Sequence, residues 1–276
     1  MTDTAFPASL AFIGGGNMAR SLIGGLLKNG MPGDRIHVAD PNESTRAALA
    51  ADFGVHTHAT AADAALQAEC WLLAVKPQVM DSVCDSLHDA VAQRQPLVIS
   101  IAAGIPLQRL RQHLGEGAAI VRTMPNTPAL IGLGATGMFA ADDVSASQRA
   151  QAQAVMQSAG LVEWIADESL MDAVTAVSGS GPAYVFLLAE AMADAAQSLG
   201  LPRGTAIALA NQTLLGAAHL LSESTDADAA TLRQRVTSPN GTTQAAIESF
   251  ERDAFRDIVQ RALTAARDRG IELAAG

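Results

Sequence analysis

The sequence has little cysteine, little lysine and no long apolar run. Its two cysteines, Cys70 and Cys84, fit neither a disulfide framework nor a metal-ligand spacing, so we expect reduced thiols and no metal site. No apolar run reaches the roughly 18 residues of a membrane span, and no basic segment precedes the first apolar one. We therefore expect neither a membrane helix nor a signal peptide, and a cytoplasmic protein.

The charge is mostly of one sign. A formal net charge of −10 argues against nucleic acid or an anionic membrane as a partner. The apolar fraction of 49% and the charged fraction of 17% exclude a disordered chain. With 276 residues the chain is long enough for two cores. A small anionic ligand would have to be held by local groups, against the general field of the protein.

Short apolar runs alternate with helical patterns in the first part of the chain, and only helical patterns follow. Continuous runs such as 70–75 are typical of strands buried in a parallel sheet. The sequence predicts strands at 9–13, 35–39, 55–57, 70–75, 97–101, 119–123, 134–139 and 161–165, and later helices at 168–177, 182–199, 203–222, 227–235 and 243–270. The predicted fold is an α/β Rossmann-like dinucleotide-binding domain (1–166) followed by an all-α domain (167–276).

Near the N-terminus an apolar strand runs directly into a glycine-rich turn and a helix. In the G-x-G-x-x-A pattern the first glycine permits the turn, the second lets the backbone approach a pyrophosphate, and the alanine lets helix and strand pack closely. A second predicted strand ends at an acidic residue, which in such sites accepts hydrogen bonds from a ribose. The candidate cofactor-binding residues are Gly14, Gly15, Gly16, Asn17, Met18, Ala19, Asp40 and Asn42.

Two further loops follow predicted strands at the edge of the sheet where open parallel sheets bind ligands. Lys76, one of two lysines, is either a cofactor contact or a surface charge, and Pro77 suits the first turn of a helix. The small residues after the fifth strand either let a nicotinamide ribose lie close or form a tight turn only. The candidate cofactor-binding residues here are Ala74, Val75, Lys76, Pro77, Ile101, Ala102 and Ala103.

Residues 236–243 read VTSPNGTT and come just before an amphipathic stretch. Backbone N–H groups at a helix N-terminus attract anions, and the hydroxyls of Ser238, Thr242 and Thr243 can cap those donors or turn toward a bound carboxylate. The loop is therefore either a cradle for a small anion or an ordinary N-cap loop, since such loops are common before helices.

Neither a catalytic histidine pair nor a lysine is evident in the second half of the chain. None of the six histidines is paired with an acidic residue at a catalytic spacing, so none is predicted to act as a general base. The predicted helical domain contains no lysine, whereas hydroxyacid dehydrogenases and reductases of open-chain imines use a lysine on the substrate side. Hydroxyl groups and backbone donors alone would suit the reduction of a cyclic imine.

Six segments together resemble the pyrroline-5-carboxylate reductase family. They follow one another in the family's order and span nearly the whole chain: GGGNMA (14–19), AVKP (74–77), AAG (102–104), RTMPNTP (122–128), SGSGPAY (178–184) and SPNGTT (238–243). The resemblance implies reduction of a cyclic imine to L-proline with NADPH or NADH as cofactor. It also implies a C-terminal domain that binds substrate and forms a homodimer, which in many members assembles to a decamer.

The resemblance also implies roles for single residues. Ser238, Gly241, Thr242 and Thr243 would hold the carboxylate and ring nitrogen of the substrate, with Thr243 as the catalytic residue that donates to the nitrogen. Glu168 is a further substrate-binding candidate. The family has glycine at position 240, where this chain has asparagine, which also tolerates a left-handed backbone, so the turn is expected to survive.

Three questions stay open at this point. The first is the cofactor: Asp40 favours NADH, whereas the family often prefers NADPH. Hydrogen-bond donors to a 2′-phosphate are available from Asn42, Ser44 and Arg46. We therefore expect both cofactors to work. The protein could instead reduce another small cyclic imine, or be a non-catalytic dinucleotide-binding sensor. The helices between 182 and 221 carry apolar residues on more than one face, which fits a dimer interface or the centre of a monomeric core.

Overall fold

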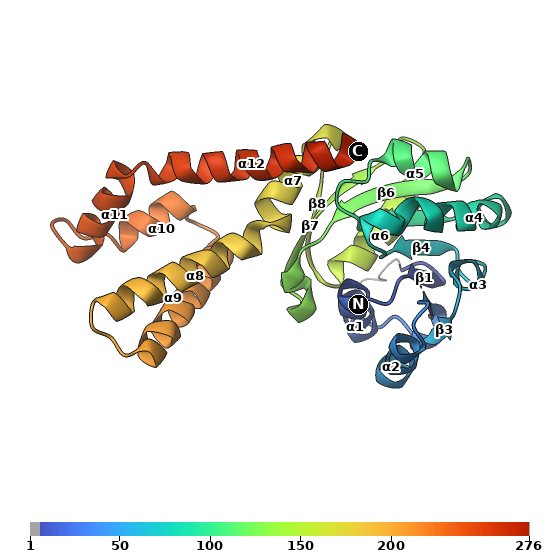
Figure 1. Cartoon of the computed structure of the whole chain (residues 1–276), viewed down its shortest axis with the longest axis horizontal. Coiled ribbons are helices and arrows are strands. Elements are labelled where there is room, and N and C mark those ends of the chain that lie inside the picture. Colours follow the sequence, from blue (N-terminus) through green and yellow to red (C-terminus); the bar gives the residue numbers. More distant parts are fainter. Residues whose placement is uncertain (1–5, 276) are drawn as a thin grey trace. The chain divides into compact units, whose positions relative to one another are not determined.

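The computed structural model describes residues 6–275, which form two compact units (Figure 1). The first unit holds the chain up to Ser180 together with the segment from Ala266 onward, and the second holds Gly181–Ala265. This division comes later in the chain than the predicted domain boundary at 166/167. The reason is that the segment around Val174 packs on the sheet, where Gly137 leaves no room for a Cβ atom beside the valine side chain.

The first unit is built on an eight-stranded sheet with the strand order β3-β2-β1-β4-β5-β6-β7-β8. Strand β7 runs antiparallel to β6, and all other neighbours are parallel. The strands are β1 (Leu10–Ile13), β2 (Ile36–Ala39), β3 (His56–His58), β4 (Cys70–Leu73), β5 (Leu97–Ser100), β6 (Ala119–Met124), β7 (Gly134–Ala140) and β8 (Gly160–Trp164). Each predicted strand is confirmed within two residues at either end.

The strand order contains a point at which the chain reverses its direction across the sheet. Strand β1 pairs with β2 on one side and with β4 on the other, so the chain moves outward from β1 to β3 and then crosses back. In open α/β sheets the crevice at such a point, beyond the carboxyl ends of the strands, is where ligands bind. The loops that begin at Gly14 and Ala74 both leave the sheet there.

Helices cover the sheet, and its central strands are buried along their whole length. Every residue of β1, β4 and β5 is buried, as expected for parallel strands covered on both faces. Trp71 is completely buried, and its indole N–H donates to the carbonyl oxygens of Ala65 and Ala68 at 2.9 and 3.1 Å. The helices of this unit are α1 (Asn17–Lys28), α2 (Glu43–Phe53), α3 (Ala61–Ala65), α4 (Met80–Arg94), α5 (Leu107–Leu114), α6 (Ala146–Gln157) and α7 (Met171–Val174).

The second unit is helical throughout. Its helices are α8 (Gly181–Ser198), α9 (Arg203–Glu223), α10 (Ala229–Arg235), α11 (Thr242–Arg252) and α12 (Phe255–Ala275), the last of which continues into the first unit. Within residues 6–275 no helix is long and apolar enough to cross a membrane.

The prediction of one long helix over 243–270 is wrong. Ala254 has a φ of 55°, in the left-handed region, and separates α11 from α12. The break is held by side chains on both sides: the rings of Phe250 and Phe255 lie 5.3 Å apart, and Arg256 hydrogen-bonds both carboxylate oxygens of Glu251. The sequence has neither glycine nor proline at this position, and apolar spacing continues across it, so no local signal marks the break.

Replacing Ala254 with glycine is expected to stabilise the protein. A left-handed backbone costs an L-residue about 1–2 kcal/mol, which glycine avoids at a smaller entropic cost, so Ala254→Gly should raise the free energy of unfolding by about 0.5–1 kcal/mol. The matched control, Ala262→Gly inside α12, should lower it by about 1 kcal/mol. Urea denaturation of both variants measures this, and a loss of stability in Ala254→Gly would contradict the strain argument.

Candidate functional site

The glycine-rich turn after β1 is fixed by a very close backbone contact. Gly14 has a φ of 106°, and its N–H donates to the carbonyl of Ala39 at 2.8 Å. A Cβ atom at position 14 would lie 2.7 Å from the carbonyl oxygen of Ala74. Only glycine can therefore hold the chain in this conformation this close to β4.

The N-terminus of α1 leaves room for an anionic group. Gly16 is the N-cap residue, no side chain caps the helix, and a Cβ atom at this position would meet nothing within 4 Å. The first N–H groups of the helix, beginning at Asn17 and Met18, lack intrahelical partners and carry partial positive charge. Ala19 is completely buried and lets the helix approach the sheet. These features fit the pyrophosphate of a dinucleotide.

Asp40 lies beside the glycine-rich turn. Its carboxylate accepts hydrogen bonds from the N–H groups of Gly15 (3.0 Å) and Asn42 (2.9 Å), one on each oxygen. The side-chain oxygen of Asn42 in turn caps α2, accepting from the N–H of Ser44 at 2.9 Å. Arg46 donates to the carbonyl of Asp40 at 2.7 Å. The end of β2 thus presents a carboxylate, and the guanidinium of Arg46 contacts the backbone of the same turn.

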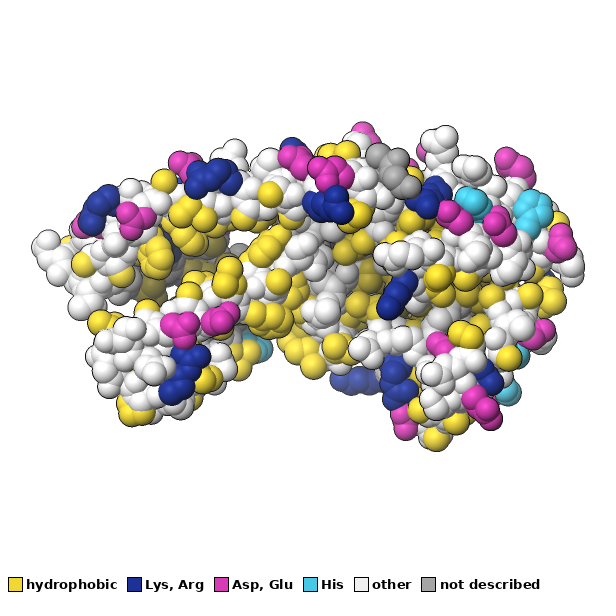
Figure 2. Space-filling view, in the orientation of Figure 1, with side chains coloured by type: hydrophobic (Ala, Val, Ile, Leu, Met, Phe, Trp, Pro, Cys, Tyr) yellow, Lys and Arg dark blue, Asp and Glu magenta, His cyan; other side chains and the backbone are white. Residues whose placement is uncertain are grey.

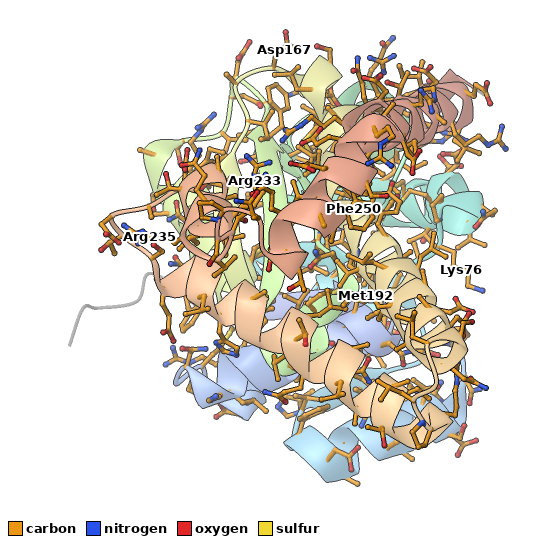
Figure 3. The ribbon with its side chains drawn as sticks, turned by 90° about the vertical axis from the view of Figure 1, so that its left-hand side faces the viewer. Lys76, Asp167, Met192, Arg233, Arg235 and Phe250 are labelled. Carbon is orange, nitrogen blue, oxygen red and sulfur yellow. The ribbon has the colours of Figure 1, made fainter. Side chains whose placement is uncertain are left out.

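The loops after β4 and β5 line the same edge of the sheet. The N–H of Ala74 donates to the carbonyl of Ile13 at 2.8 Å, and the Val75 side chain lies next to Gly14. Lys76 is exposed, and Figure 3 shows its amine extending away from the ribbon. Pro77 begins a short 3₁₀ helix (Pro77–Val79), as its predicted place in a first turn requires.

The loop after β5 has one buried and two accessible small residues. Ala102 is buried, whereas Ile101 is half-buried and Ala103 exposed. Gly104 has a φ of 71°, so the chain turns sharply before α5. The structure thus brings all three predicted cofactor loops to the carboxyl edge of neighbouring strands.

Glu168 is engaged within the first unit. Its Oε1 accepts hydrogen bonds from the backbone N–H of Leu107 at 2.8 Å and from Arg122 at 3.0 Å. Arg122 lies on β6, and its side chain is almost completely buried, so the carboxylate compensates a buried charge. The pair ties the start of α5 to β6 and to the segment that follows β8. The Arg122–Glu168 contact spans 46 residues, so no local pattern in the sequence indicates this pair.

Asn126 joins two segments that carry the family resemblance. Its amide nitrogen donates to the carbonyl of Ser178 at 2.9 Å, and its amide oxygen accepts from the N–H of Ala135 at 2.9 Å. Ser178 belongs to a π-helical turn (Thr175–Gly179), a rare form that often marks functional sites. This contact spans 52 residues, so it leaves no trace in local spacing along the sequence.

The loop before α11 belongs to the second unit. Asn240 has a φ of 56°, so asparagine adopts the left-handed backbone as expected, and its N–H donates to Gln244 Oε1 at 2.7 Å. Gly241 is the N-cap residue of α11, with no side-chain cap, and its own N–H donates to the carbonyl of Ser238 at 3.0 Å. Thr242 and Thr243 are the first two residues of the helix. Neither hydroxyl caps the helix, so its first N–H groups are open to a ligand.

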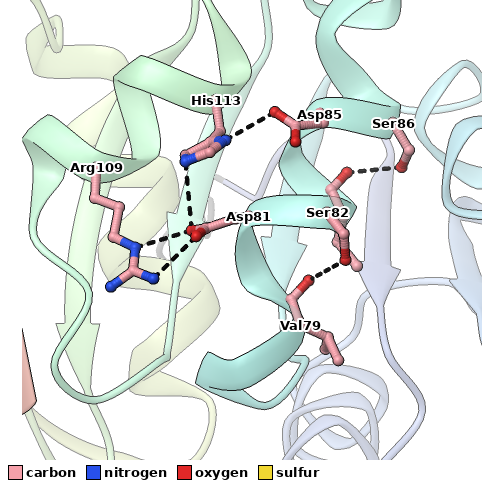
Figure 4. Close-up of polar contacts among 8 residues, drawn as sticks. Val79, Asp81, Ser82, Asp85, Ser86, Arg109 and His113 are labelled. Carbon is pink, nitrogen blue, oxygen red and sulfur yellow. Dashed lines mark hydrogen bonds and ion pairs between the residues drawn. The ribbon is translucent and has the colours of Figure 1, made fainter. Parts of the chain in front are cut away.

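His113 meets two carboxylates where α4 packs against α5, a contact that spacing along the sequence does not reveal (Figure 4). Its Nδ1 lies 2.8 Å from Asp85 Oδ1, and its Nε2 lies 3.6 Å from Asp81 Oδ1. Arg109 donates two hydrogen bonds of 2.9 Å to Asp81, which hold the pKa of that carboxyl below its usual range. The cluster ties α4 to α5. Because this pKa is lowered in the folded state, the contribution to stability is present at neutral pH and is lost as the pH falls through it.

Two family models match this chain, one in its N-terminal part and one in its C-terminal part. Residues 168–273 match a family model described as pyrroline-5-carboxylate reductase dimerisation, and residues 9–104 match one described as NADP oxidoreductase coenzyme F420-dependent. The pyrroline-5-carboxylate reductase of Pseudomonas aeruginosa is 50% identical over 265 residues, covering 96% of both chains. That of Haemophilus influenzae is 45% identical and covers 96% of this chain and 97% of the relative.

Solved structures of reductases with similar names also superpose on this chain. The structure of a pyrroline-5-carboxylate reductase from Coxiella burnetii has a TM-score of 0.93 at 42% identity, covering 97% of this chain and 99% of the other. A Plasmodium falciparum pyrroline carboxylate reductase, solved with NADP bound, has a TM-score of 0.83 at 27% identity, covering 97% and 98%.

Proposed function

The chain belongs to the pyrroline-5-carboxylate reductase family, and we propose that it binds its cofactor at Gly14–Ala19 and the carboxylate of its substrate at Ser238–Thr243. The reaction is the NAD(P)H-dependent reduction of the C=N bond of 1-pyrroline-5-carboxylate to L-proline, the last step of proline biosynthesis. When bound, the reduced cofactor supplies a hydride to the imine carbon, and a proton on the ring nitrogen completes the amine.

The uncapped start of α11 is the observation that supports this substrate site. Gly241 contributes by having no side chain, since a Cβ atom there would lie 3.0 Å from the carbonyl oxygen of Ser238. Ser238 and Thr242 are exposed beside this uncapped helix start, and their hydroxyls together with its first N–H groups suit a carboxylate. In a protein of net charge −10, such local donors are needed to attract an anion.

Thr243 is the proposed catalytic residue, through a hydrogen bond from its hydroxyl to the ring nitrogen. The second unit has no lysine that could act as a general acid on the substrate side. None is required, because the imine is basic enough to arrive protonated or to take its proton from water. Glu168 stays a substrate-binding proposal through Oε2, since both of its hydrogen bonds within the described residues use Oε1.

The proposed cofactor site uses the whole carboxyl edge of the central strands. The uncapped N-terminus of α1 would receive the pyrophosphate, and Asp40 and Asn42 would meet the adenine ribose. The residues after β4 and β5, including Lys76 and Ala102, would line the nicotinamide half. This assignment is supported by the fit of Gly14 and Gly16 to a close backbone approach.

The purified protein is expected to oxidise reduced nicotinamide only when pyrroline-5-carboxylate is supplied, and to yield one proline for each cofactor oxidised. Absorbance at the nicotinamide band follows the cofactor, and amino-acid analysis identifies the product. Turnover of another cyclic imine alone would indicate a different reductase. Cofactor binding without any turnover, with NADH and with NADPH, would indicate a sensor.

Replacing Asp40 is expected to shift the cofactor preference toward NADPH. The carboxylate at the end of β2 repels a 2′-phosphate, so Asp40→Ser should raise the ratio of kcat/KM for NADPH to that for NADH by about tenfold, which corresponds to about 1.4 kcal/mol. The control Asp40→Asn keeps the shape and removes only the charge. The ratio does not depend on the folded fraction of a variant, and an unchanged ratio would remove Asp40 from the cofactor site.

The variant Thr243→Val separates catalysis from helix capping. It keeps the shape and deletes one hydrogen bond worth about 1–3 kcal/mol, so turnover should fall roughly 5- to 150-fold. Because Gly241 is the N-cap residue, the melting temperature should stay close to that of the wild type. Thr243→Ser should keep much of the activity, and Thr264→Val, on α12, serves as the matched control. A destabilised variant with unaltered kinetics would mean that Thr243 has a structural role only.

The second unit is also the proposed dimer interface. Phe186 and Leu187 on α8 and Leu220 on α9 are each at least 64% exposed, and Figure 2 shows apolar side chains over these helices. A groove of about 700 Å³ has a largely apolar lining that includes Met192, Phe250 and Phe255. Figure 3 labels Met192, Arg233 and Phe250 among its lining residues. The range 168–273, which matches the dimerisation model, contains all of these residues.

Sedimentation equilibrium at micromolar concentration is expected to give a homodimer or an even multiple of it, with a decamer as the proposed larger assembly. Apolar area of this extent is rarely left in contact with water on a monomer. A monomer mass would contradict the proposal.

The cytoplasm is the proposed compartment. Both cysteines are free, as is usual for proteins of a reducing compartment. Burial also raises the pKa of the Cys84 thiol to about 12, and it raises the pKa of the Cys70 thiol further. Cell fractionation checks the compartment.

A further inference from the structure

Three histidines gather on one face at the sheet edge that β2 and β3 form. His37 pairs in register with His56 across the two strands, and His58 lies two residues further along β3, on the same face as His56. The rings of His37 and His56 are stacked with centroids 5.1 Å apart, and those of His37 and His58 lie 5.3 Å apart. The six segments that carry the family resemblance include none of these residues, so the reductase reaction does not explain the cluster.

Two nitrogen atoms of this cluster lie close together. His37 Nδ1 is 3.1 Å from His58 Nε2. Two imidazole nitrogens at this separation share either a proton or a metal ion. For metal–nitrogen bonds of about 2.0–2.1 Å, an angle of roughly 90–110° at the metal places the two nitrogens roughly 2.9–3.3 Å apart. The observed distance lies within this range.

The pair is accessible from water and has one carboxylate nearby. Burial has the larger effect on His58 and lowers the pKa of its imidazole, whereas the carboxylate of Asp63, on α3, acts in the opposite direction. His56 is exposed, and His37 and His58 are half-buried, so an ion can reach the nitrogens from water. Figure 2 shows histidine side chains at the surface beside the part of the first unit where Figure 1 has α3 and β3.

We propose that His37 Nδ1 and His58 Nε2 are the two protein ligands of an open site for a divalent transition-metal ion such as Zn²⁺ or Ni²⁺. Imidazole suits these ions, whereas Mg²⁺ prefers oxygen ligands. Residues 6–275 contain no group of three or more His, Cys, Asp or Glu side chains that could hold a metal, so water fills the other positions and the site binds more weakly than a closed zinc site. The expectation of no metal site rested on the spacing of the two cysteines, and two histidines on adjacent strands have no fixed spacing that could have indicated this pair.

A bound ion would brace the edge of the sheet next to Asp40. The N–H of Asp40 donates to the carbonyl of His58 at 3.2 Å, so the metal pair lies on β2, which leads into this turn, and on β3 beside it. An ion that joins β2 to β3 binds the folded state and not the unfolded chain, and therefore stabilises the first unit. This effect does not depend on turnover of the substrate.

Isothermal titration calorimetry with ZnCl₂ tests the site on full-length protein that carries no polyhistidine tag and has been freed of metal. We expect one ion for each chain, a thermal midpoint that rises by several degrees when the ion is in hundredfold excess over its Kd, and no response to MgCl₂. His37→Gln and His58→Gln should each weaken Zn²⁺ binding at least tenfold. His219→Gln, an exposed histidine on α9, is the matched control and should bind like the wild type.

Several results would overturn the proposal. Identical titration curves for wild type and His58→Gln would show that the ion binds elsewhere. The absence of binding up to millimolar Zn²⁺ would leave the pair as a hydrogen bond only. Melting curves in EDTA establish that the variants are folded. The electron paramagnetic resonance spectrum of the Cu²⁺ form provides a further test. Hyperfine coupling to two nitrogens in the wild type, and to one in His58→Gln, would support the assigned ligands.

Discussion

The close approach of Gly14 to the backbone of Ala74 is the constraint on which the cofactor half of the molecule depends. With a positive φ and no Cβ, the chain turns directly above the point where β1 passes between β2 and β4. That turn sets the start of α1, and it brings the N–H of Gly15 within 3.0 Å of Asp40. A larger residue at position 14 would displace β4 and the loop that continues through Lys76.

A helix in each unit, α1 in the first and α11 in the second, begins without a side-chain cap. Gly16 before α1 and Gly241 before α11 are both N-cap residues with an extended backbone, and no side chain caps either helix. Both helices thus offer unsatisfied N–H groups at their start, where the helix dipole is positive. In the proposed function, these two helix starts are the local positive sites that attract a dinucleotide and a small carboxylate to a chain of net charge −10.

The sequence was sufficient for features that depend on local pattern. Strands with continuous apolar runs, such as β4 and β5, and the glycine spacing before α1 could be predicted because each residue's neighbours along the chain set its conformation. The break at Ala254 could not, because neither glycine nor proline marks this position in the sequence. The hydrogen bonds of Asn126 could not be predicted either, because they join segments that are distant in the sequence.

Contacts between charged groups were also beyond local pattern. His113 meets Asp85 only because α4 and α5 pack side by side, and Glu168 meets Arg122 across 46 residues. The cofactor loops could be predicted from the sequence because the carboxyl ends of parallel strands all lie at one edge of the sheet. The topology therefore brings these loops together whatever their separation in the sequence.

The central claim is that the uncapped starts of α1 and α11 each bind one anion. Backbone amide hydrogen exchange in the presence of NADPH, of L-proline and of both tests it most directly. The account predicts that NADPH slows exchange in residues 14–19 and in the turn after β2, and that proline added to the NADPH complex slows exchange in residues 238–244. Unchanged exchange of 238–244 with saturating proline, together with protection elsewhere, would contradict it.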